Sequence, residues 1–426
     1  MIRLAALLLA ILVPLYAAGQ TPPEHAVTAQ AIALQTDRAH GPLVALRRDL
    51  HAHPELAGQE ARTAATVAAR LRTLGLEVQI GLYGHSVVGV LRGAHAGRTI
   101  AWRAELDALQ TYLVDATPFR SQTPGVHHGC GHDTHIAIAL GIAEVLAQHR
   151  DQLHGNAVFI FQPEEETFRG AKAMLDRGLL TALPIDEIYG VHVTALPVGQ
   201  IVVRHGEMFA YQRRIRIALK DGLTAAEIEQ LAGQVQGALA RSRPQARPWE
   251  IQRIAEPGVG LTSATTAFQD YLIVDRLQPT RTGAGTVNLE ADLYETDAAR
   301  LASIIPRVTQ VVEASGHGGQ LLSVDFIQQN PTVLNDPALT RSAMQTIRQA
   351  FGADAVQLAH GQGPFFNDDF AYFQQRVPGV YFFLGGSNAD KGITAMNHTP
   401  NFAVDEESMR TGVKTFATLI ASRLGP

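Results

Sequence analysis

Five side chains of the types that bind divalent transition metals are spread along the chain: Cys130, His132, Glu166, His192 and His398. Sulfur, nitrogen and oxygen donors in such a number can hold a pair of ions. A further carboxylate, Glu165, stands beside one of the five and is available to take a proton from a water molecule that the ions activate. This combination is typical of a two-metal hydrolase.

Two of the five candidates lie in one short loop. Cys130 is flanked by Gly129 and Gly131, which suit a tight turn that passes close to other groups. Cys130 and His132 are two positions apart, so both can point toward one ion, and a thiolate and an imidazole are ligands that a borderline-soft metal prefers. We therefore predict that both bind metal. Asp133 is expected to cap the helix that follows, which is a structural role.

A run of three glutamates, residues 164–166, supplies the acidic part of the pattern. Such a run is usually a solvated surface, but this one follows the apolar segment Val158–Phe161 and precedes the small-residue turn at Gly170. Some of the three must therefore face a crevice. A hydrolytic centre needs one carboxylate as a ligand and another as a general base, and adjacent residues of an irregular turn can fill both roles.

His51 and His53 also have the spacing of a ligand pair. Pro54 fixes an extended turn after them, so we interpret both as hydrogen-bonded structural histidines. Several histidines outside these motifs have no ligand-like neighbours and are interpreted as surface or loop residues: His85, His95, His149, His154, His205, His317 and His360.

Predicted helices and strands alternate along residues 24–206 and could position these side chains. Apolar periodicity predicts two helices and three strands there: helices over Ala61–Leu74 and His135–Gln148, and strands over Thr99–Leu106, Ala157–Phe161 and Ile185–Val193. This alternation predicts an α/β fold with a mainly parallel sheet sandwiched by helices, whose chemistry lies at the carboxyl ends of the strands. The glutamate run and His192 stand at such ends, a placement that packing alone explains poorly.

The pattern changes between residues 207 and 328. Alternating and helical segments follow one another there: strands over Arg213–Leu219, Val287–Tyr294 and Gln320–Phe326, and helices over Ala225–Ala240 and Asp297–Ser315. We predict an inserted α+β lid domain at 207–328, and a catalytic domain formed by 24–206 and 329–426. The catalytic domain is expected to resume with a helix over Pro337–Phe351.

Residues 1–19 are predicted to be a secretory signal, with Arg3, the apolar stretch Leu4–Tyr16 and a small-residue cleavage site. A membrane anchor is the alternative, but the apolar stretch is shorter than the roughly 20 residues that span a bilayer. Export to the periplasm or the medium would expose Cys130, the only cysteine, to an oxidising compartment. A lone thiol there is an inert buried residue, an oxidation-sensitive group or a thiolate protected by metal, and its neighbours favour the last.

The bulk composition limits the function classes. The 426 residues are 46% hydrophobic and 18% charged, which indicates a folded protein of two domains or of one domain with an insertion. A net charge of -5 without a long basic run gives no indication of nucleic-acid binding. After removal of the signal nothing predicts membrane association. We expect a small-molecule partner, and a homo-oligomer is compatible with the sequence.

Together the motifs resemble the amidohydrolase branch of the aminoacylase and carboxypeptidase family of metallopeptidases, which includes hippurate hydrolase, N-acyl-amino-acid hydrolases and the plant auxin-conjugate hydrolases. The matching segments follow the family's order along nearly the whole mature chain: Asp49–Glu55, Arg103–Leu109, Gly125–His135, Phe161–Glu166, Gly190–Val193, Asp368–Phe373, Pro378–Gly385 and Asn397–Phe402.

The resemblance implies a zinc-peptidase-like α/β domain with an inserted lid and two divalent ions. It implies that the five residues named at the outset hold the ions and that Glu165 is the general base, which takes a proton from a metal-activated water and passes it to the leaving amine. Sulfur ligation favours zinc, with manganese, cobalt and nickel as alternatives. The expected function is that of an exported amidohydrolase acting on N-acyl amino acids or small peptide-like amides. A dipeptidase or carboxypeptidase is the alternative.

The chain departs from the family pattern in the lid. Family members usually carry a histidine-containing stretch there that stabilises the tetrahedral oxyanion, but no histidine occurs between His205 and His317. Asn288 stands where an arginine is usual, after the pair Gly285-Thr286. These departures allow a reading from another class, a binding protein that keeps metal without turnover. A pure binder, however, would have no need of Glu165.

Overall fold

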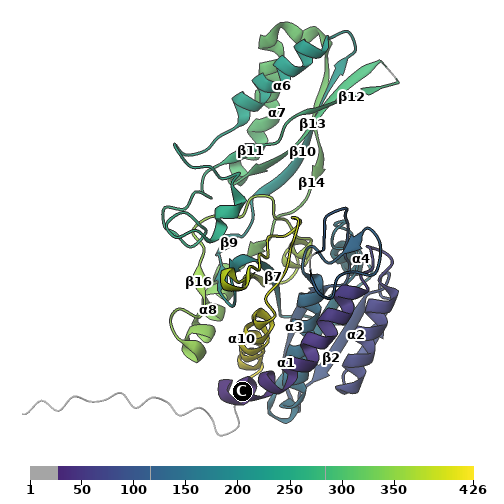
Figure 1. The fold of residues 1–426 in the computed structure, drawn as a ribbon, viewed down its shortest axis with the longest axis vertical. Coiled ribbons are helices and arrows are strands. Elements are labelled where there is room, and N and C mark those ends of the chain that lie inside the picture. Colours follow the sequence, from purple (N-terminus) through teal and green to yellow (C-terminus); the bar gives the residue numbers. More distant parts are fainter. Residues whose placement is uncertain (1–26, 116, 284) are drawn as a thin grey trace, which may run out of the picture.

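The computed structural model describes residues 27–115, 117–283 and 285–426, so the predicted signal at residues 1–19 lies outside the described residues. Two sheets organise the chain, and they occupy the two ends of an elongated molecule (Figure 1). The larger sheet and its helices form the lower body in this view, and the smaller sheet with two helices forms the upper one. None of the described helices has both the length and the apolarity needed to cross a bilayer.

The larger sheet has eight strands in the order β1-β2-β6-β3-β7-β17-β8-β16. Their bounds in this order are Glu77–Ile80, Val87–Arg92, His154–Gln162, His95–Glu105, Glu187–Pro197, Gly379–Ser387, Ile201–Val203 and Gln357–Leu358. The four central strands β6, β3, β7 and β17 pair in parallel, whereas the pairs β1/β2, β2/β6 and β17/β8 are antiparallel. The expectation of a mainly parallel sheet is confirmed.

Helices cover both faces of this sheet. One face packs against α1 (Ala29–Ala52), α2 (Ala61–Thr73), α3 (His132–Ala147), α8 (Pro337–Phe351) and α10 (Glu407–Arg423). The other packs against α4 (Gly170–Asp176), α5 (Leu179–Ala182) and α9 (Phe370–Gln374). Successive strand residues point to opposite faces, so Trp102 belongs to the first core and its neighbour Ala101 to the second. This double burial explains why the central strands read as continuous apolar runs.

The smaller sheet is antiparallel and carries the two helices of the upper body. Its strands are β11 (Leu272–Val274), β13 (Thr286–Glu295), β10 (Tyr211–Lys220) and β14 (Leu321–Gln329), with β12 (Gln278–Thr282) paired to β13. The helices α6 (Ala225–Leu239) and α7 (Ala298–Val312) bury their apolar faces on it. Thr224 and Glu227 form a capping box at the start of α6. The domain limits at 206/207 and 328/329 stay a prediction.

Several elements were not expected from the sequence. The helix α1, the longest of those described, buries the polar residues Thr36 and Arg47 on its apolar face. These two residues interrupt the apolar pattern, so the helical periodicity of the segment is weak. The apolar pattern of the sequence also did not predict four short strands: β2 and β8 of the larger sheet, and β11 and β12 of the lid. Four further two-residue strands form two small separate sheets: β4 (Leu109–Gln110) with β5 (Val126–His127), and β9 (Gly206–Glu207) with β15 (Leu334–Asn335). A long connection, residues 241–270, joins α6 to β11 with only one helical turn, Ile251–Ala255.

Candidate metal centre

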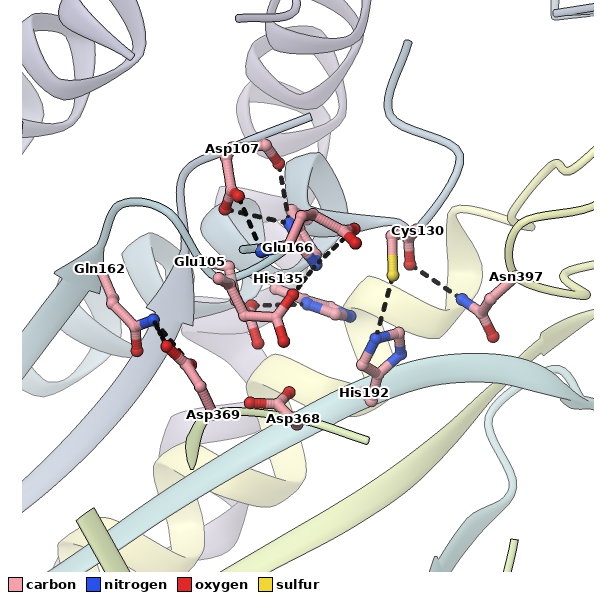
Figure 2. A network of polar contacts seen from close by, with 12 residues as sticks. Glu105, Asp107, Cys130, His135, Gln162, Glu166, His192, Asp368, Asp369 and Asn397 are labelled. Atoms are coloured by element: carbon pink, nitrogen blue, oxygen red, sulfur yellow. Dashed lines mark hydrogen bonds and ion pairs between the residues drawn. The ribbon is translucent and has the colours of Figure 1, made fainter. Parts of the chain in front are cut away.

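The five predicted ligands come from four separate segments and lie close together. Figure 2 shows three of them, Cys130, Glu166 and His192, beside the central sheet. Cys130 and His132 stand at the start of α3, Glu166 in the turn after β6, His192 on β7 and His398 in the loop after β17. The sulfur of Cys130 is 3.3 Å from Nε2 of His192. Oε1 of Glu166 is 3.6 Å from Nε2 of His398 and 3.8 Å from Nε2 of His132.

These donors form two adjacent groups that share one sulfur. Cys130, His132 and His192 each offer a donor atom within 4.8 Å of the others, and so do Cys130, Glu166 and His398. Around a tetrahedral ion with bonds of about 2.0–2.3 Å, neighbouring donors lie roughly 3.4–3.7 Å apart. The observed separations are close to that spacing. The arrangement therefore has the dimensions of two neighbouring cation positions.

Unpaired buried atoms at the centre also fit a cation. Nε2 of His132 and Oε1 of Glu166 are buried and have no hydrogen-bond partner among the described residues. Buried polar atoms without a partner are costly, and in native proteins such atoms are paired or bound to an ion. Both atoms face each other across the 3.8 Å gap described above. A metal ion between them would satisfy both.

The electrostatics of the centre favour positive charge. Burial, and then the negative charge of Glu166 and other carboxylates, raises the pKa of the Cys130 thiol well above its usual range. A thiolate at this position therefore needs a cation beside it. Burial alone would lower the pKa of His132, but its hydrogen bond to Asp107 and the charge of Glu105 raise it to about 10. At His192, by contrast, burial lowers the pKa well below its usual value, so that ring is held neutral and its nitrogen is available to a cation.

The loop of Cys130 requires its two glycines. Gly131 has a φ of 95°, and a Cβ added there would lie 2.5 Å from a methyl carbon of Val193. A Cβ at Gly129 would lie 2.7 Å from the ring of His127. Both glycines therefore allow the close approach that the sequence predicted. The predicted cap is wrong, because Gly131 is the N-cap of α3 and Asp133 lies inside the helix.

Asp133 has another structural role. Its buried carboxylate accepts hydrogen bonds from Nε of Arg47 at 2.7 Å and from Nδ1 of His51 at 2.8 Å. Nε2 of His51 lies 3.1 Å from the carboxylate of Asp115. His53 donates to the carbonyl of Asp49 at 2.8 Å. The structure thus places both histidines in hydrogen bonds and leaves them out of the ligand groups.

The turn after β6 separates the three glutamates. Glu164 has a φ of 55°, and this kink turns its neighbours in different directions. The side chain of Glu165 is buried and that of Glu166 is half-buried, so the expectation that some of them face inward is met. Oε2 of Glu165 lies 3.7 Å from Nε2 of His132. Glu165 therefore stands at the edge of the ligand groups, within one water molecule's reach of them.

Comparison with known proteins gives the family. Residues 101–422 match Peptidase family M20/M25/M40. The chain is 31% identical over 393 residues to thermostable carboxypeptidase 1 of Saccharolobus solfataricus, with 88% of this chain and 94% of that protein covered. The chain belongs to the M20 family. It is 29% identical to N-acetylcysteine deacetylase of Bacillus subtilis, with 89% and 96% of the two chains covered.

A solved structure of this family has the same fold. The Bacillus subtilis YXEP protein, described as a dinuclear metal-binding peptidase of the M20 family, superposes with a TM-score of 0.72 at 27% identity, covering 91% of this chain and 99% of that one. The predicted resemblance and the α/β fold with a separate lid are confirmed. This M20-family protein is thus a metal-dependent hydrolase of amide bonds.

Further residues of this M20-family centre hold the candidate ligands in place, and the sequence did not single them out. Asp107 accepts from Nδ1 of His132 through its carbonyl at 2.7 Å and from the N–H of Glu166 through its carboxylate at 3.0 Å. His135 joins the carboxylate of Glu105, at 2.8 Å, to the N–H of Val193, at 2.9 Å. All of them lie in the motif segments, but residue type and spacing alone do not separate a ligand from its support.

Asn397 connects three of the ligand-bearing segments. Its Nδ2 donates to the carbonyl of Cys130 at 2.9 Å (Figure 2) and to the carbonyl of Val193 at 3.0 Å. It immediately precedes His398, so one amide group fixes the loop of Cys130, the strand of His192 and the loop of His398 relative to one another. The positioning role of Asn397 cannot be recognised from a single sequence, because its hydrogen-bond partners are backbone carbonyls, which every residue has.

Proposed function

We propose that the protein is an exported amidohydrolase that cleaves the amide bond of N-acyl amino acids or small peptide-like amides. The observation that carries this proposal is the convergence of five donor side chains with one additional buried carboxylate, Glu165, beside them. Relatives of similar length include an N-acetylcysteine deacetylase, 29% identical. The predicted signal at residues 1–19 supports export to the periplasm or the medium.

We assign two divalent ions to the donor groups, held by Cys130, His132, Glu166, His192 and His398. Bound there, the ions would supply Lewis acidity that polarises an amide carbonyl and makes a water molecule more acidic. The mixture of sulfur, nitrogen and oxygen donors favours zinc, and manganese, cobalt and nickel remain alternatives. Asp107, His135 and Asn397 would keep the donor atoms oriented.

Glu165 is proposed to move the proton. Burial, followed by the charges of Asp368 and Glu166, raises the pKa of Glu165 well above its usual range. A carboxylate with a raised pKa is a better proton acceptor, and in its protonated form it is a suitable donor to a leaving amine. Its position at the edge of the donor groups lets it take a proton from water on one side and deliver it on the other.

A carboxypeptidase or dipeptidase activity is the second candidate. It is favoured by the 31% identity to the Saccharolobus solfataricus protein named thermostable carboxypeptidase 1. Both activities use the same centre, so substrate choice separates them. A screen of N-acetyl, N-benzoyl and long-acyl amino acids beside dipeptides and acylated peptides, with metal analysis of the purified mature chain, tests which amide is cleaved and which metal is bound.

The decisive variant is Glu165→Gln, which keeps size and hydrogen bonding but removes the base. We expect hydrolysis to fall by about two to four orders of magnitude while metal content equals that of the parent. Glu164→Gln is the matched control, because its half-buried side chain belongs to the same turn but to none of the donor groups. Parental activity in Glu165→Gln would refute its role as base. A parent without metal-dependent turnover on any amide would support the binding-protein reading.

Export is tested separately. Expression of the full chain in a bacterial host, followed by cell fractionation and N-terminal sequencing, should give a periplasmic or secreted protein that begins near Gln20. An unprocessed N-terminus in the cytosolic fraction would reject the signal without affecting the proposed chemistry.

A further inference from the structure

The long connection 241–270 extends from the lid and is fixed to the catalytic body. Its Leu261 carbonyl accepts from the N–H of His360 at 2.8 Å, and its Phe268 carbonyl accepts from the N–H of Gln362 at 2.9 Å. Just beyond it, the hydroxyl of Tyr271 donates to the carbonyl of Gln362 at 2.9 Å. Connections of this length without regular structure are usually functional, and this one is held in a defined place.

Apolar contacts reinforce these hydrogen bonds. Ile254, Leu261 and Phe268 are buried, with at most 1% of each residue exposed. They belong to the same apolar cluster as Leu196 and Ala359 of the catalytic body. The helical turn Ile251–Ala255 packs against β7, the strand that carries His192. The connection therefore brings lid residues to the edge of the candidate metal centre.

A cavity of about 250 Å³ opens at this meeting point. Three of the candidate donors, Cys130, His192 and His398, belong to its lining. Ile251 of the connection, Phe365 and Phe366 of the catalytic body, and Met396 line the rest of it together with polar uncharged residues. Among the described residues that line the cavity, none is Arg, Lys, Asp or Glu.

The part of the lining away from the donor residues favours apolar groups. A charged group placed against the Ile251, Phe365, Phe366 and Met396 side chains would lose water without gaining a partner of opposite charge there, which is unfavourable. An apolar group would instead contact the isoleucine, phenylalanine and methionine side chains and gain free energy by leaving water. The cavity also contacts three of the donor residues directly, so a group bound there belongs to the molecule whose amide lies at the centre.

We propose that Ile251, together with Phe365, Phe366 and Met396, forms a specificity pocket for an apolar, uncharged group of the amide substrate. This inference rests on the proposed function and names its substrate class. The group is either the acyl chain or the amino-acid side chain, and both share the chemistry that the pocket recognises. The wall at residue 251 comes from the lid connection of the same chain, so substrate choice depends on a segment outside the catalytic motifs.

The test compares kcat/KM for pairs of substrates that differ in one group. One arm varies the amino acid, with N-acetyl-leucine against N-acetyl-glutamine. The other varies the acyl group, with N-benzoyl-glycine against N-acetyl-glycine. In at least one arm the parent should favour the apolar member. Ile251→Asp should reduce that preference by about tenfold or more, and Ile251→Val should retain it. The arm that changes identifies which group enters the pocket.

Ile327→Asp is the matched control, because Ile327 is an exposed isoleucine of the same lid, on β14. It should leave both preferences unchanged. As a second readout, benzoate and leucine should bind the metal-free parent by calorimetry, and the ligand that enters the pocket should bind Ile251→Asp at least tenfold more weakly. Metal content and thermal midpoint show whether each variant is folded and loaded. If the parent, Ile251→Asp and Ile327→Asp showed equal substrate preferences in kcat/KM, the assignment of the specificity pocket would be wrong. If the parent hydrolysed no amide, the proposed function itself would be wrong.

Discussion

Nε2 of His192 lies 3.3 Å from the sulfur of Cys130, although 62 positions separate the two residues in the sequence. The contact joins the loop before α3 to strand β7. Such proximity between a thiol and an imidazole that are both buried is expected where two side chains share an ion. The relationship makes both residues sensitive probes of metal binding.

Cys130→Ser and His192→Ala should each lower the metal content of the purified protein. The hydroxyl of serine is a much weaker ligand than a thiolate, and alanine offers no donor atom. His95→Ala serves as a control because His95 is an exposed histidine outside the donor groups. Elemental analysis after dialysis gives the stoichiometry. If either ligand variant bound as much metal as the control, the assignment of that residue would be wrong.

Asn397→Leu should weaken metal binding by about 10- to 100-fold, the usual effect of removing a group that orients ligands. Leucine has a similar size but cannot donate to the carbonyls of Cys130 and Val193. Asn388→Leu is the matched control, since the Asn388 amide donates to Asp405 and to neither carbonyl. Competition with a chromophoric chelator measures both affinities. Equal affinities for the two variants would show that the Asn397 amide does not orient the centre.

Arg103→Met should destabilise the fold severely. The Arg103 guanidinium is fully buried and pairs with Glu105, Asp368 and Asp369. Its removal would leave three buried carboxylates without their cation, and breaking a buried ion pair costs about 3–5 kcal/mol. Urea unfolding followed by far-ultraviolet circular dichroism measures the loss, which should shrink at acid pH as the carboxylates become protonated.

The control for Arg103 is Arg92→Met. Arg92 is exposed and pairs with the exposed Glu77 across the edge of the sheet, so its loss should change stability little. Similar unfolding curves for Arg103→Met and Arg92→Met would mean that the buried network contributes no more than a surface pair.

The stability contributed by His51 should depend on pH. Burial and the nearby Arg47 lower the pKa of His51, but the charge of Asp133 and the hydrogen bonds to Asp115 and Asp133 raise it above the ordinary value of 6.5. Two further titratable rings, those of His127 and His128, also interact electrostatically with His51. Because both ring nitrogens contact carboxylates, the folded protein favours the imidazolium form of His51 more than the unfolded chain does.

A raised folded pKa means that the folded state binds more protons than the unfolded state, so this contribution is complete below pH 6.5 and is lost as pH rises through the folded pKa. The difference in unfolding free energy between the parent and His51→Gln should therefore be largest near pH 6 and should decrease toward pH 9. Unfolding curves at several pH values test this. A difference that grew with pH would reverse the assigned protonation state.

The larger part of the fold was predictable because apolar periodicity carries it. The helix over Pro337–Phe351 was predicted with the bounds of α8, and strands β3, β6 and β7 were placed within a few residues. The helix α1 was missed because Arg47 lies on its buried stripe, and only tertiary contacts make a buried arginine stable. The sequence gives the residue types on one face of a helix, but it does not show which distant residue, here Asp133, will pair with a buried arginine.

The candidate site divides in the same way. The grouping of candidate donors was predictable because glutamate and histidine are unusual at the ends of apolar strands, as at Glu166 and His192, and because Cys130 and His132 share one glycine-flanked loop. Asn397 and Asp107 act on backbone groups, and Ile251 reaches the centre through a connection without regular structure. Such contributions depend on three-dimensional placement alone, since an asparagine, an aspartate and an isoleucine in loops have no distinguishing pattern in one sequence.

The single cysteine of this protein gives an experimental advantage. Because every thiol signal must come from residue 130, alkylation by iodoacetamide or colour development with a disulfide reagent would report one defined atom without mutagenesis. Ions that coordinate this sulfur should slow its modification, so the labelling rate becomes a direct occupancy gauge. Oxidative damage and loss of cation would then be followed by the same reagent in unmodified protein.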